Sequence, residues 1–169
     1  MRDEKTKAGF VAVIGAPNAG KSTLVNHLVG FKISIVTHKV QTTRTRIRGV
    51  CMHGASQIIF VDTPGIFEPK RKLDRAMVDA AWLGADDADL IIFLYDVTRR
   101  KVDSDTSRIL SGLKENNKEA ILVLNKIDLV KSELLLPIIK RFQAENIFSD
   151  TFMVSAENGS GCEKLLEYL

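Results

Sequence analysis

The chain has 169 residues, a formal net charge of +3 and 45% apolar residues, values that predict one soluble domain with a full hydrophobic core. No apolar run approaches the roughly 18 residues of a membrane span. The two cysteines form no Cys-x-x-Cys pair, which argues against a metal or disulfide scaffold. We expect residues 1–8, which are charged and lack an apolar signal core, to form a flexible tail, and residues 9–169 to form the domain.

Apolar, β-rich segments alternate with amphipathic ones along the chain, a pattern typical of parallel strands joined by crossover helices. Five residues separate the second predicted strand from the third, too few for a crossover helix, so this pair should be antiparallel. We therefore predict an α/β fold with a six-stranded, mostly parallel sheet, one antiparallel edge strand and helices on both faces. The predicted strands are Phe10–Ile14, Ile47–Met52, Ile58–Asp62, Leu90–Asp96, Ala120–Asn125 and Thr151–Ser155.

Five helices are predicted in the gaps between strands. The first begins at Lys21 and ends near Gly30, the third begins at Asp103, and the last begins at Ser160 with a capping box to Glu163. The last amphipathic pattern is unfinished where the sequence stops, so we expect a longer parent polypeptide. The side chains predicted to face the core from the second, third and fourth helices are Leu73, Met77, Ala80, Ala81, Ile109, Leu110, Leu113, Leu135, Ile138, Ile139 and Phe142.

A glycine-rich segment joins the first strand to the first helix. Four residues separate Gly15 from Gly20, and Lys21 and Ser22 follow, which is the spacing of a phosphate-binding loop. Glycines let backbone N–H groups turn toward phosphate oxygens, and the positive end of the helix favours the anion. Lys21 should reach the β- and γ-phosphates, and Ser22 should offer its hydroxyl to Mg²⁺. The predicted nucleotide-binding residues of this loop are Gly15, Ala16, Pro17, Asn18, Ala19, Gly20, Lys21, Ser22 and Thr23.

A second polar segment, Asp62-Thr63-Pro64-Gly65, follows the third predicted strand. The carboxyl ends of parallel strands are where ligands of open α/β sheets bind. We expect Asp62 to hold the Mg²⁺ shell, and we expect Gly65 to bring its N–H close to the γ-phosphate. By itself this tetrapeptide is typical of an ordinary turn; its place after a strand and after the phosphate loop favours the nucleotide-binding interpretation.

A third polar segment, Asn125-Lys126-Ile127-Asp128, follows the fifth predicted strand. Guanine presents two adjacent donors that one carboxylate can accept, whereas adenine would leave Asp128 unpaired, so this segment predicts GTP rather than ATP as ligand. Lys126 should lie over the base or ribose, and Asn125 should tie this loop to the phosphate loop. Ser155 and Ala156 fit a loop whose backbone N–H meets guanine O6. An alternative function is that of a P-loop kinase that transfers phosphate to a small substrate. This function would account for Lys21 but would leave Asp128 without a binding role.

These four elements, in this order, resemble the translation-factor-related GTPases, whose fold is the P-loop NTPase G domain. Within that class the sequence is most similar to the Era family, in Asn18, in Lys32–Val36 leading to Gln41–Arg44, and in Asp62–Ile66. The likeness covers Gly9 to Leu169. It implies a molecular switch that binds Mg²⁺·GTP and hydrolyses it to GDP and phosphate.

The resemblance also implies roles for single residues. Lys21, Thr43, Gly65 and Asn18 would act in hydrolysis, and Ser22, Thr43 and Asp62 would ligate Mg²⁺, with Thr42 as a weaker candidate beside Thr43. Isoleucine stands at position 66, where signalling GTPases hold a glutamine that orients water. Relatives with an apolar residue there and an asparagine in the phosphate loop use K⁺, so we expect Asn18 to help bind K⁺.

For partners, the resemblance implies a C-terminal KH domain, absent from this sequence, that binds 16S rRNA of the small ribosomal subunit during its assembly. It implies a cytoplasmic protein whose parent associates peripherally with the inner face of the cell membrane. Basic clusters such as Lys70-Arg71-Lys72 are compatible with RNA or with solvated loops beside phosphates. The oligomeric state stays open. The alternatives are a Der-type or MnmE-type GTPase domain, and a GTP-dependent docking module with incidental hydrolysis.

Overall fold

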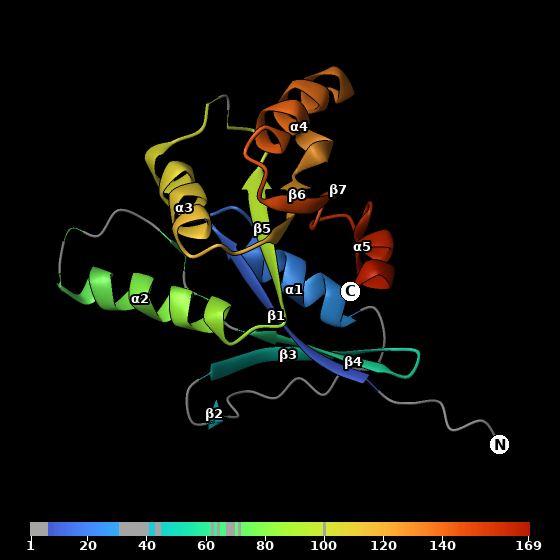
Figure 1. Cartoon of the computed structure of the whole chain (residues 1–169). Helices are drawn as coiled ribbons and strands as arrows, with labels where there is room; N and C mark the ends of the chain where they lie inside the picture. The colour runs from blue at the N-terminus through green and yellow to red at the C-terminus, as the bar shows by residue number, and fades with distance from the viewer. Residues whose placement is uncertain are drawn as a thin grey trace.

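A twisted sheet forms the centre of the computed structural model, with helices against both faces (Figure 1). The structure describes residues 7–30, 41–42, 45–61, 63, 65–66, 70, 72–99 and 101–169, without the side chains of residues 41–42, 45–46 and 73–74. The strand order is β2-β3-β4-β1-β5-β6-β7. The strands are β1 (Lys7–Gly15), β2 (Gln41–Thr42), β3 (Thr45–His53), β4 (Ser56–Val61), β5 (Leu90–Asp96), β6 (Ala120–Asn125) and β7 (Phe148–Met153).

The pairing of the strands confirms the predicted α/β class. β4, β1, β5, β6 and β7 are parallel, and β3 pairs with β4 in the antiparallel direction, as the short connection between them requires. Several details differ from the prediction. β1 begins at Lys7, so residues 7 and 8 of the predicted tail pair with β4, and β7 begins at Phe148, three residues before the predicted Thr151. The two-residue β2 adds a seventh strand outside β3. β7 ends at Met153 and does not reach Ser155, because the N–H of Ser155 turns out of the sheet and donates to the Ser160 carbonyl (2.9 Å).

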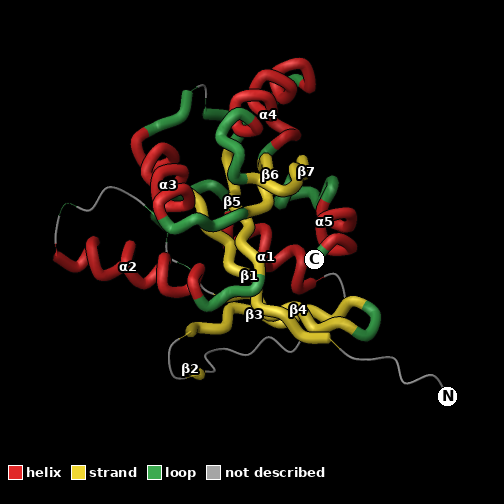
Figure 2. The backbone as a smooth tube through the Cα atoms, in the orientation of Figure 1, coloured by secondary structure: helices red, strands yellow, loops and turns green. Residues whose placement is uncertain are grey.

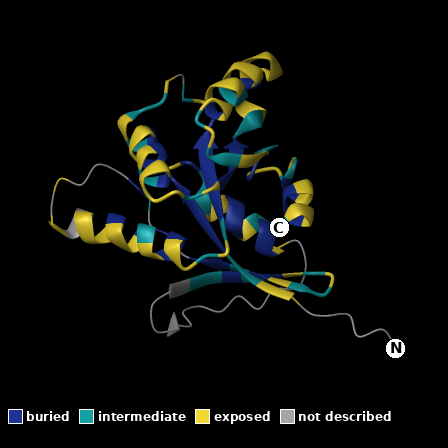
Figure 3. Ribbon diagram, viewed as in Figure 1, coloured by how far each residue is buried: buried dark blue, intermediate teal, exposed yellow. Residues whose placement is uncertain are grey.

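The described helices divide between the two faces of the sheet (Figure 2). Their bounds are α1 Lys21–Gly30, α2 Lys72–Asp86, α3 Ser104–Glu115, α4 Leu135–Gln143 and α5 Cys162–Tyr168, with 3₁₀ turns η1 Ile127–Leu129 and η2 Ser132–Leu134. One buried cluster joins α1 and α5 to strand residues such as Val13 and Val123, and a second joins α2, α3 and α4 to the alternating residues such as Ile14 and Leu122. Figure 3 shows the result, with the central strands buried and the outer helix surfaces exposed.

The buried face of α2 differs from the prediction. Ala81 is buried as expected, but Met77 is 41% exposed and Ala80 is also exposed, while Val78, Trp82 and Ala85 pack against the second cluster. An alanine-rich helix offers two weakly apolar stripes, and contact with the sheet selects between them. The side chain of Leu73 lies outside the described residues.

The predictions for α3 and α4 are confirmed, and the predicted start of α5 is wrong. Ile109, Leu110, Leu113, Leu135 and Phe142 are buried, and Ile138 and Ile139 are partly buried in the same cluster. α5 is capped by Gly161 (φ 74°) without a side-chain hydrogen bond, so Ser160 and Glu163 form no capping box. A β-carbon at Gly161 would collide with the Met153 carbonyl, so glycine geometry starts this helix. Within the described part of the chain, no helix combines the length and apolarity that crossing a membrane requires.

Candidate nucleotide-binding site

The loop from Gly15 to Gly20 lies at the carboxyl end of β1 and leads into α1. A β-carbon at Gly15 would lie 2.7 Å from the Leu94 carbonyl oxygen, and one at Gly20 (φ 99°) would collide with the Asn125 amide. Asn18 also has a left-handed backbone (φ 62°), which asparagine tolerates better than most residues. The two glycines are therefore required by close packing as well as by the turn.

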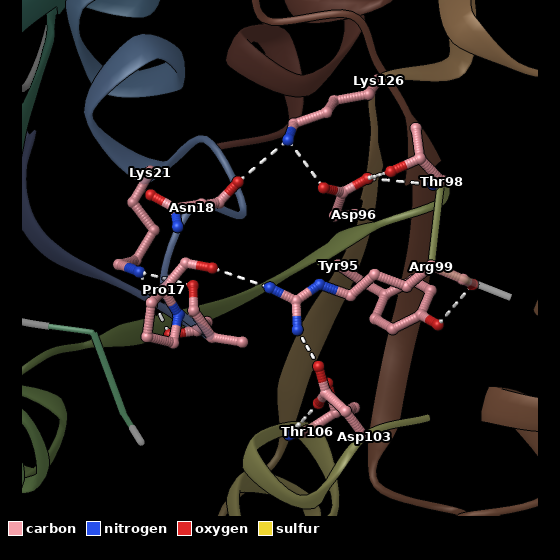
Figure 4. A network of polar contacts seen from close by, with 12 residues as sticks. Pro17, Asn18, Lys21, Tyr95, Asp96, Thr98, Arg99, Asp103, Thr106 and Lys126 are labelled. Atoms are coloured by element: carbon pink, nitrogen blue, oxygen red, sulfur yellow. Dashed lines mark hydrogen bonds and ion pairs between the residues drawn. The ribbon is translucent and has the colours of Figure 1, made fainter. Parts of the chain in front are cut away.

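Lys21 folds back onto this loop. Its Nζ donates to the carbonyls of Gly15 (3.1 Å) and Ala16 (2.9 Å) (Figure 4). Burial, with smaller contributions from the nearby charges of Arg99 and Arg48, lowers the pKa of Lys21 from 10.5 to about 8. Among the residues that the structure describes, no carboxylate pairs with this ammonium group, and an anionic ligand would supply a counter-charge.

Three more side chains hold the next carbonyls of the loop. Arg99 Nη2 donates to Pro17 O (2.7 Å), Lys126 Nζ donates to Asn18 O (2.9 Å), and Asn125 Nδ2 donates to Ala19 O (2.9 Å). Each carbonyl from residue 15 to residue 19 thus accepts a hydrogen bond from a side chain. Because the N–H of a trans peptide points away from its C=O, the N–H groups of residues 18 and 20 face the opposite side, as an anion cradle requires.

A pocket of about 310 Å³ opens beside this loop, between the loops that follow β6 and β7. This volume is at the lower end of the range for small-molecule sites. The residues that line it are Gly20, Thr23, Asn125, Lys126, Asp128, Leu129, Ser155, Ala156 and Glu157. Five of the nine belong to the predicted guanine-binding segments, so the structure brings these segments together around one cavity next to the phosphate loop.

Asn125 joins the two parts of the site. Its side chain is 2% exposed, and while Nδ2 donates to Ala19 O, its Oδ1 accepts from the N–H of Ala156 (2.9 Å). One buried amide therefore fixes the phosphate loop and the loop after β7 relative to each other. Both of its hydrogen-bonding groups are used, so few other side chains could replace it.

Lys126 is held by Asp96, a residue that the sequence analysis did not assign to the site. Lys126 Nζ lies 2.6 Å from Asp96 Oδ2, and Asp96 Oδ1 accepts from the N–H (2.9 Å) and hydroxyl (2.6 Å) of Thr98. Burial opposes ionisation of Asp96, but the hydrogen bonds from Lys126 and Thr98 outweigh it and hold the pKa of this carboxyl below its usual value. Asp96 ends β5, the same position that marked the other functional segments.

Several predicted residues lie close to the phosphate loop. A β-carbon at Gly65 would lie 3.3 Å from Lys21 Nζ and 3.4 Å from Pro17 Cα, so Gly65 is against the loop. Thr63 is buried, and its hydroxyl donates to the Val13 carbonyl, so this side chain faces the sheet. Ile66 is fully buried, and its N–H donates to Gly15 O (3.2 Å).

Three predicted site residues, Thr43, Asp62 and Pro64, lie outside the described residues. The side chains of Ser22 and Thr23, in the first turn of α1, are exposed, and Asp128 is exposed at the pocket. Among the residues that the structure describes, no three His, Cys, Asp or Glu side chains gather as a metal site would need.

A glycine-rich loop with its lysine at the end of β1, beside a pocket lined by the Asp128 carboxylate, is the arrangement expected of a P-loop nucleotide-binding domain. The 50S ribosome-binding GTPase family matches residues 10–126, and the chain belongs to this family. This match confirms the predicted GTPase class, and the relatives and solved structures that follow confirm the G-domain fold and the resemblance to Era.

Among curated proteins, the chain is 58% identical over 164 residues to GTPase Era of Rhizobium meliloti, covering 97% of the chain and 52% of that protein. It is 51% identical over 174 residues to GTPase Era of Caulobacter vibrioides, covering 95% of the chain and 55% of the relative. The chain therefore spans about half the length of the curated relatives that it matches.

Two solved structures are similar over 96% of the chain. One is Era in complex with MgGDPNP and nucleotides 1506–1542 of 16S ribosomal RNA, with 38% identity and a TM-score of 0.80 over 56% of that chain. The other is a variant of Aquifex aeolicus Era bound to GDP·AlF₄⁻, with 39% identity and a TM-score of 0.77 over 57% of that chain.

Proposed function

We propose that this chain is the nucleotide-binding and hydrolysing domain of an Era-type GTPase switch. The observation that carries the proposal is the double hydrogen bond of buried Asn125, which joins the loop from Gly15 to Gly20 to the loop after β7 beside the pocket. A single ligand with a purine base at one end and phosphates at the other fits that arrangement. The carboxylate of Asp128 then favours guanine, because guanine alone offers it two adjacent donors.

The phosphate end of the site selects for negative charge. Lys21 gives up its bonds to two loop carbonyls when phosphate oxygens compete for it, and the backbone N–H groups of the loop bind the remaining oxygens. Gly65 is close enough to Lys21 for its N–H to meet the same phosphate group. Loss of the γ-phosphate would remove this shared contact and release the segment around Gly65, as in a nucleotide-controlled switch.

The residues present fit Mg²⁺, an ion that prefers hard oxygen ligands. The hydroxyl of Ser22 is exposed in the first turn of α1, next to Lys21, and would supply one ligand. We propose Thr43 and Asp62 as further ligands. When bound, the ion would neutralise part of the negative charge on the β- and γ-phosphates.

Position 66, where signalling GTPases hold a glutamine that orients water, is isoleucine in this chain. Ile66 is buried in the core and offers no polar group, so an unassisted rate on the order of 10⁻⁴ to 10⁻² s⁻¹ is expected. We propose that K⁺ partly compensates, with the exposed Asn18 side chain among its ligands. The carbonyl of Asn18 is already used by Lys126, so the side-chain oxygen is the group that Asn18 offers to the ion.

The partners of the whole protein belong to the same proposal. A relative of this chain has been solved with MgGDPNP and a 16S rRNA fragment. We propose that the parent carries a KH domain beyond this G domain, binds 16S rRNA of the small ribosomal subunit during assembly, and works in the cytoplasm with peripheral contact to the membrane. Comparing ribosomal-subunit profiles and membrane fractions with and without the full-length protein tests these partners.

Hydrolysis itself is tested by measuring phosphate release from Mg²⁺·GTP and Mg²⁺·ATP in K⁺ and in Na⁺ buffers. The proposal expects release from GTP, little from ATP, and a higher rate in K⁺ than in Na⁺. Ser22→Asn should abolish release. Equal rates in K⁺ and Na⁺ would contradict the role of Asn18, and equal turnover of ATP would contradict the guanine assignment.

A further inference from the structure

Arg99 reaches the phosphate loop from a turn that none of the nucleotide-binding motifs includes. It follows β5, and its side chain is 26% exposed. Its Nη2 donates to the carbonyl of Pro17 at 2.7 Å, across 82 residues of sequence (Figure 4). This is a short, charge-assisted hydrogen bond, stronger than a bond between neutral groups. A long-range bond of this kind restrains the tip of the loop.

The guanidinium group is fixed from its other side. Its Nη1 forms an ion pair with Asp103, whose Oδ1 also accepts from the N–H of Thr106 (2.8 Å) at the start of α3. The backbone carbonyl of Arg99 accepts from the hydroxyl of Tyr95 (3.2 Å). Because both the backbone and the side chain of Arg99 have partners, the position of its guanidinium group is set by β5 and α3 before any ligand binds.

The contact acts on the peptide unit that joins Pro17 to Asn18. A cation on the oxygen of a peptide unit polarises that unit and makes its N–H a stronger donor. The N–H of the same unit belongs to Asn18 and points to the opposite side of the loop. Lys126 makes the equivalent contact with the next unit through Asn18 O (2.9 Å). Two cations from two different turns therefore hold successive carbonyls of one loop.

We propose that Arg99 is a positioning residue for nucleotide binding, which holds the Pro17–Asn18 peptide in the orientation that presents its N–H to an oxygen of the β- or γ-phosphate. This inference rests on the proposed function, since it assumes that the loop binds the phosphates of a guanine nucleotide. Arg99 acts through the loop backbone and contacts neither the base nor the reacting atoms. Its removal should therefore weaken binding of the phosphates and leave the base contacts and the chemical step in place.

The test compares Arg99→Ala with Arg99→Lys, Arg99→Gln and the wild-type chain. Lys140→Ala is the matched control, because it removes the same unit of charge from an exposed position on α4. Competition against a fluorescent GDP gives the affinities for GTP, GDP and GMP, and steady-state phosphate release gives KM and kcat. Far-UV circular dichroism and thermal unfolding of the nucleotide-free proteins report the fold.

For Arg99→Ala, we expect affinities for GTP and GDP about tenfold lower, affinity for GMP within twofold of wild type, and a KM about tenfold higher with kcat within threefold. Arg99→Lys should recover at least half of the loss on a logarithmic scale, because it keeps the cation, whereas Arg99→Gln should recover less. Lys140→Ala should change each value by less than twofold. If Arg99→Ala fails to fold, the comparison of Arg99→Gln with Arg99→Lys decides.

Two results would overturn the inference. One is an Arg99 variant that folds and binds all three nucleotides as the wild type does; the other is an equal loss for GMP, which a general loosening of the domain would produce. Failure of the proposed function is distinguishable from both, because in that case the wild-type chain itself would not bind Mg²⁺·GTP.

Discussion

Replacement of Asn125 by alanine tests the link between the two halves of the site. The change removes the donor to Ala19 O and the acceptor of the Ala156 N–H, both 2.9 Å bonds in a side chain that is 2% exposed. A buried group left without its partner costs about 1–3 kcal/mol. The pocket next to Asn125 lets water reach the vacated groups, so we take a value in the lower half of this range, about 1.5 kcal/mol for each group, a total of about 3 kcal/mol. The free variant can relax so that water solvates these groups, and nucleotide binding must then restore the native arrangement, so this cost falls on binding and corresponds to roughly 100-fold weaker binding of guanine nucleotides.

The matched control is Asn116→Ala. Asn116 also donates through Nδ2 to a carbonyl, that of Gly112 (2.7 Å), but it is exposed at the end of α3. Equilibrium titration of each nucleotide-free variant with a fluorescent GDP measures affinity, and urea unfolding measures stability. The control should bind within twofold of the wild type. A folded Asn125→Ala protein that binds within threefold of the wild type would refute the reasoning.

Three further predictions follow from the geometry. Nucleotide-free Lys21→Met should be about 1–3 kcal/mol more stable than wild type at pH 7, because the pKa of Lys21 is about 8 in the folded chain and 10.5 in the unfolded chain. This difference in stability should shrink as pH rises from 8 to 10.5. Urea unfolding at several pH values measures it, and a difference that does not change with pH would contradict the prediction. Asp128→Asn should lose about 100-fold or more in GTP affinity and gain affinity for xanthosine triphosphate, whose C2 carbonyl accepts a hydrogen bond from the new amide. Competition binding measures both affinities, and an unchanged preference for GTP would refute the prediction. Gly161→Ala should destabilise by about 1–3 kcal/mol, since φ is 74° and the new methyl meets the Met153 carbonyl; an unchanged melting temperature would refute it.

Local patterns predicted the elements that carry strong periodicity. The runs Leu90–Asp96 and Ala120–Asn125 match β5 and β6 residue for residue, because each is a continuous apolar segment bounded by polar residues. The phosphate loop was predictable for a different reason: glycine is required where a β-carbon would meet Leu94 or Asn125, and that requirement is visible in the sequence.

The structural features that the sequence did not predict depend on contacts between segments that are distant in the sequence. Met77 and Ala80 form an apolar stripe on α2, but the sheet packs against the stripe of Val78 and Ala85. The two-residue β2 exists through its pairing with β3, and such a short segment has no periodicity of its own.

The residues of the candidate site also divide into those that local sequence patterns predicted and those that only the folded chain revealed. Asn125 and Asp128 were predicted because they follow a strand in a recognised spacing. Asp96 is the last residue of β5, and its place at the carboxyl end of a parallel strand could have indicated it as a site residue. Arg99 contacts the loop from 82 residues away, and no local pattern indicates such a contact. Its role could be inferred only from the folded chain.

The central claim is that one continuous site on this domain binds a guanine nucleotide with Mg²⁺. Isothermal titration calorimetry of the nucleotide-free chain with GDP, GTP and ATP, each with Mg²⁺, tests it directly. The account predicts saturable binding of one GDP or GTP per chain and affinity for ATP lower by a factor of 10³ or more. Absence of binding to either guanine nucleotide, or equal affinity for ATP, would contradict it.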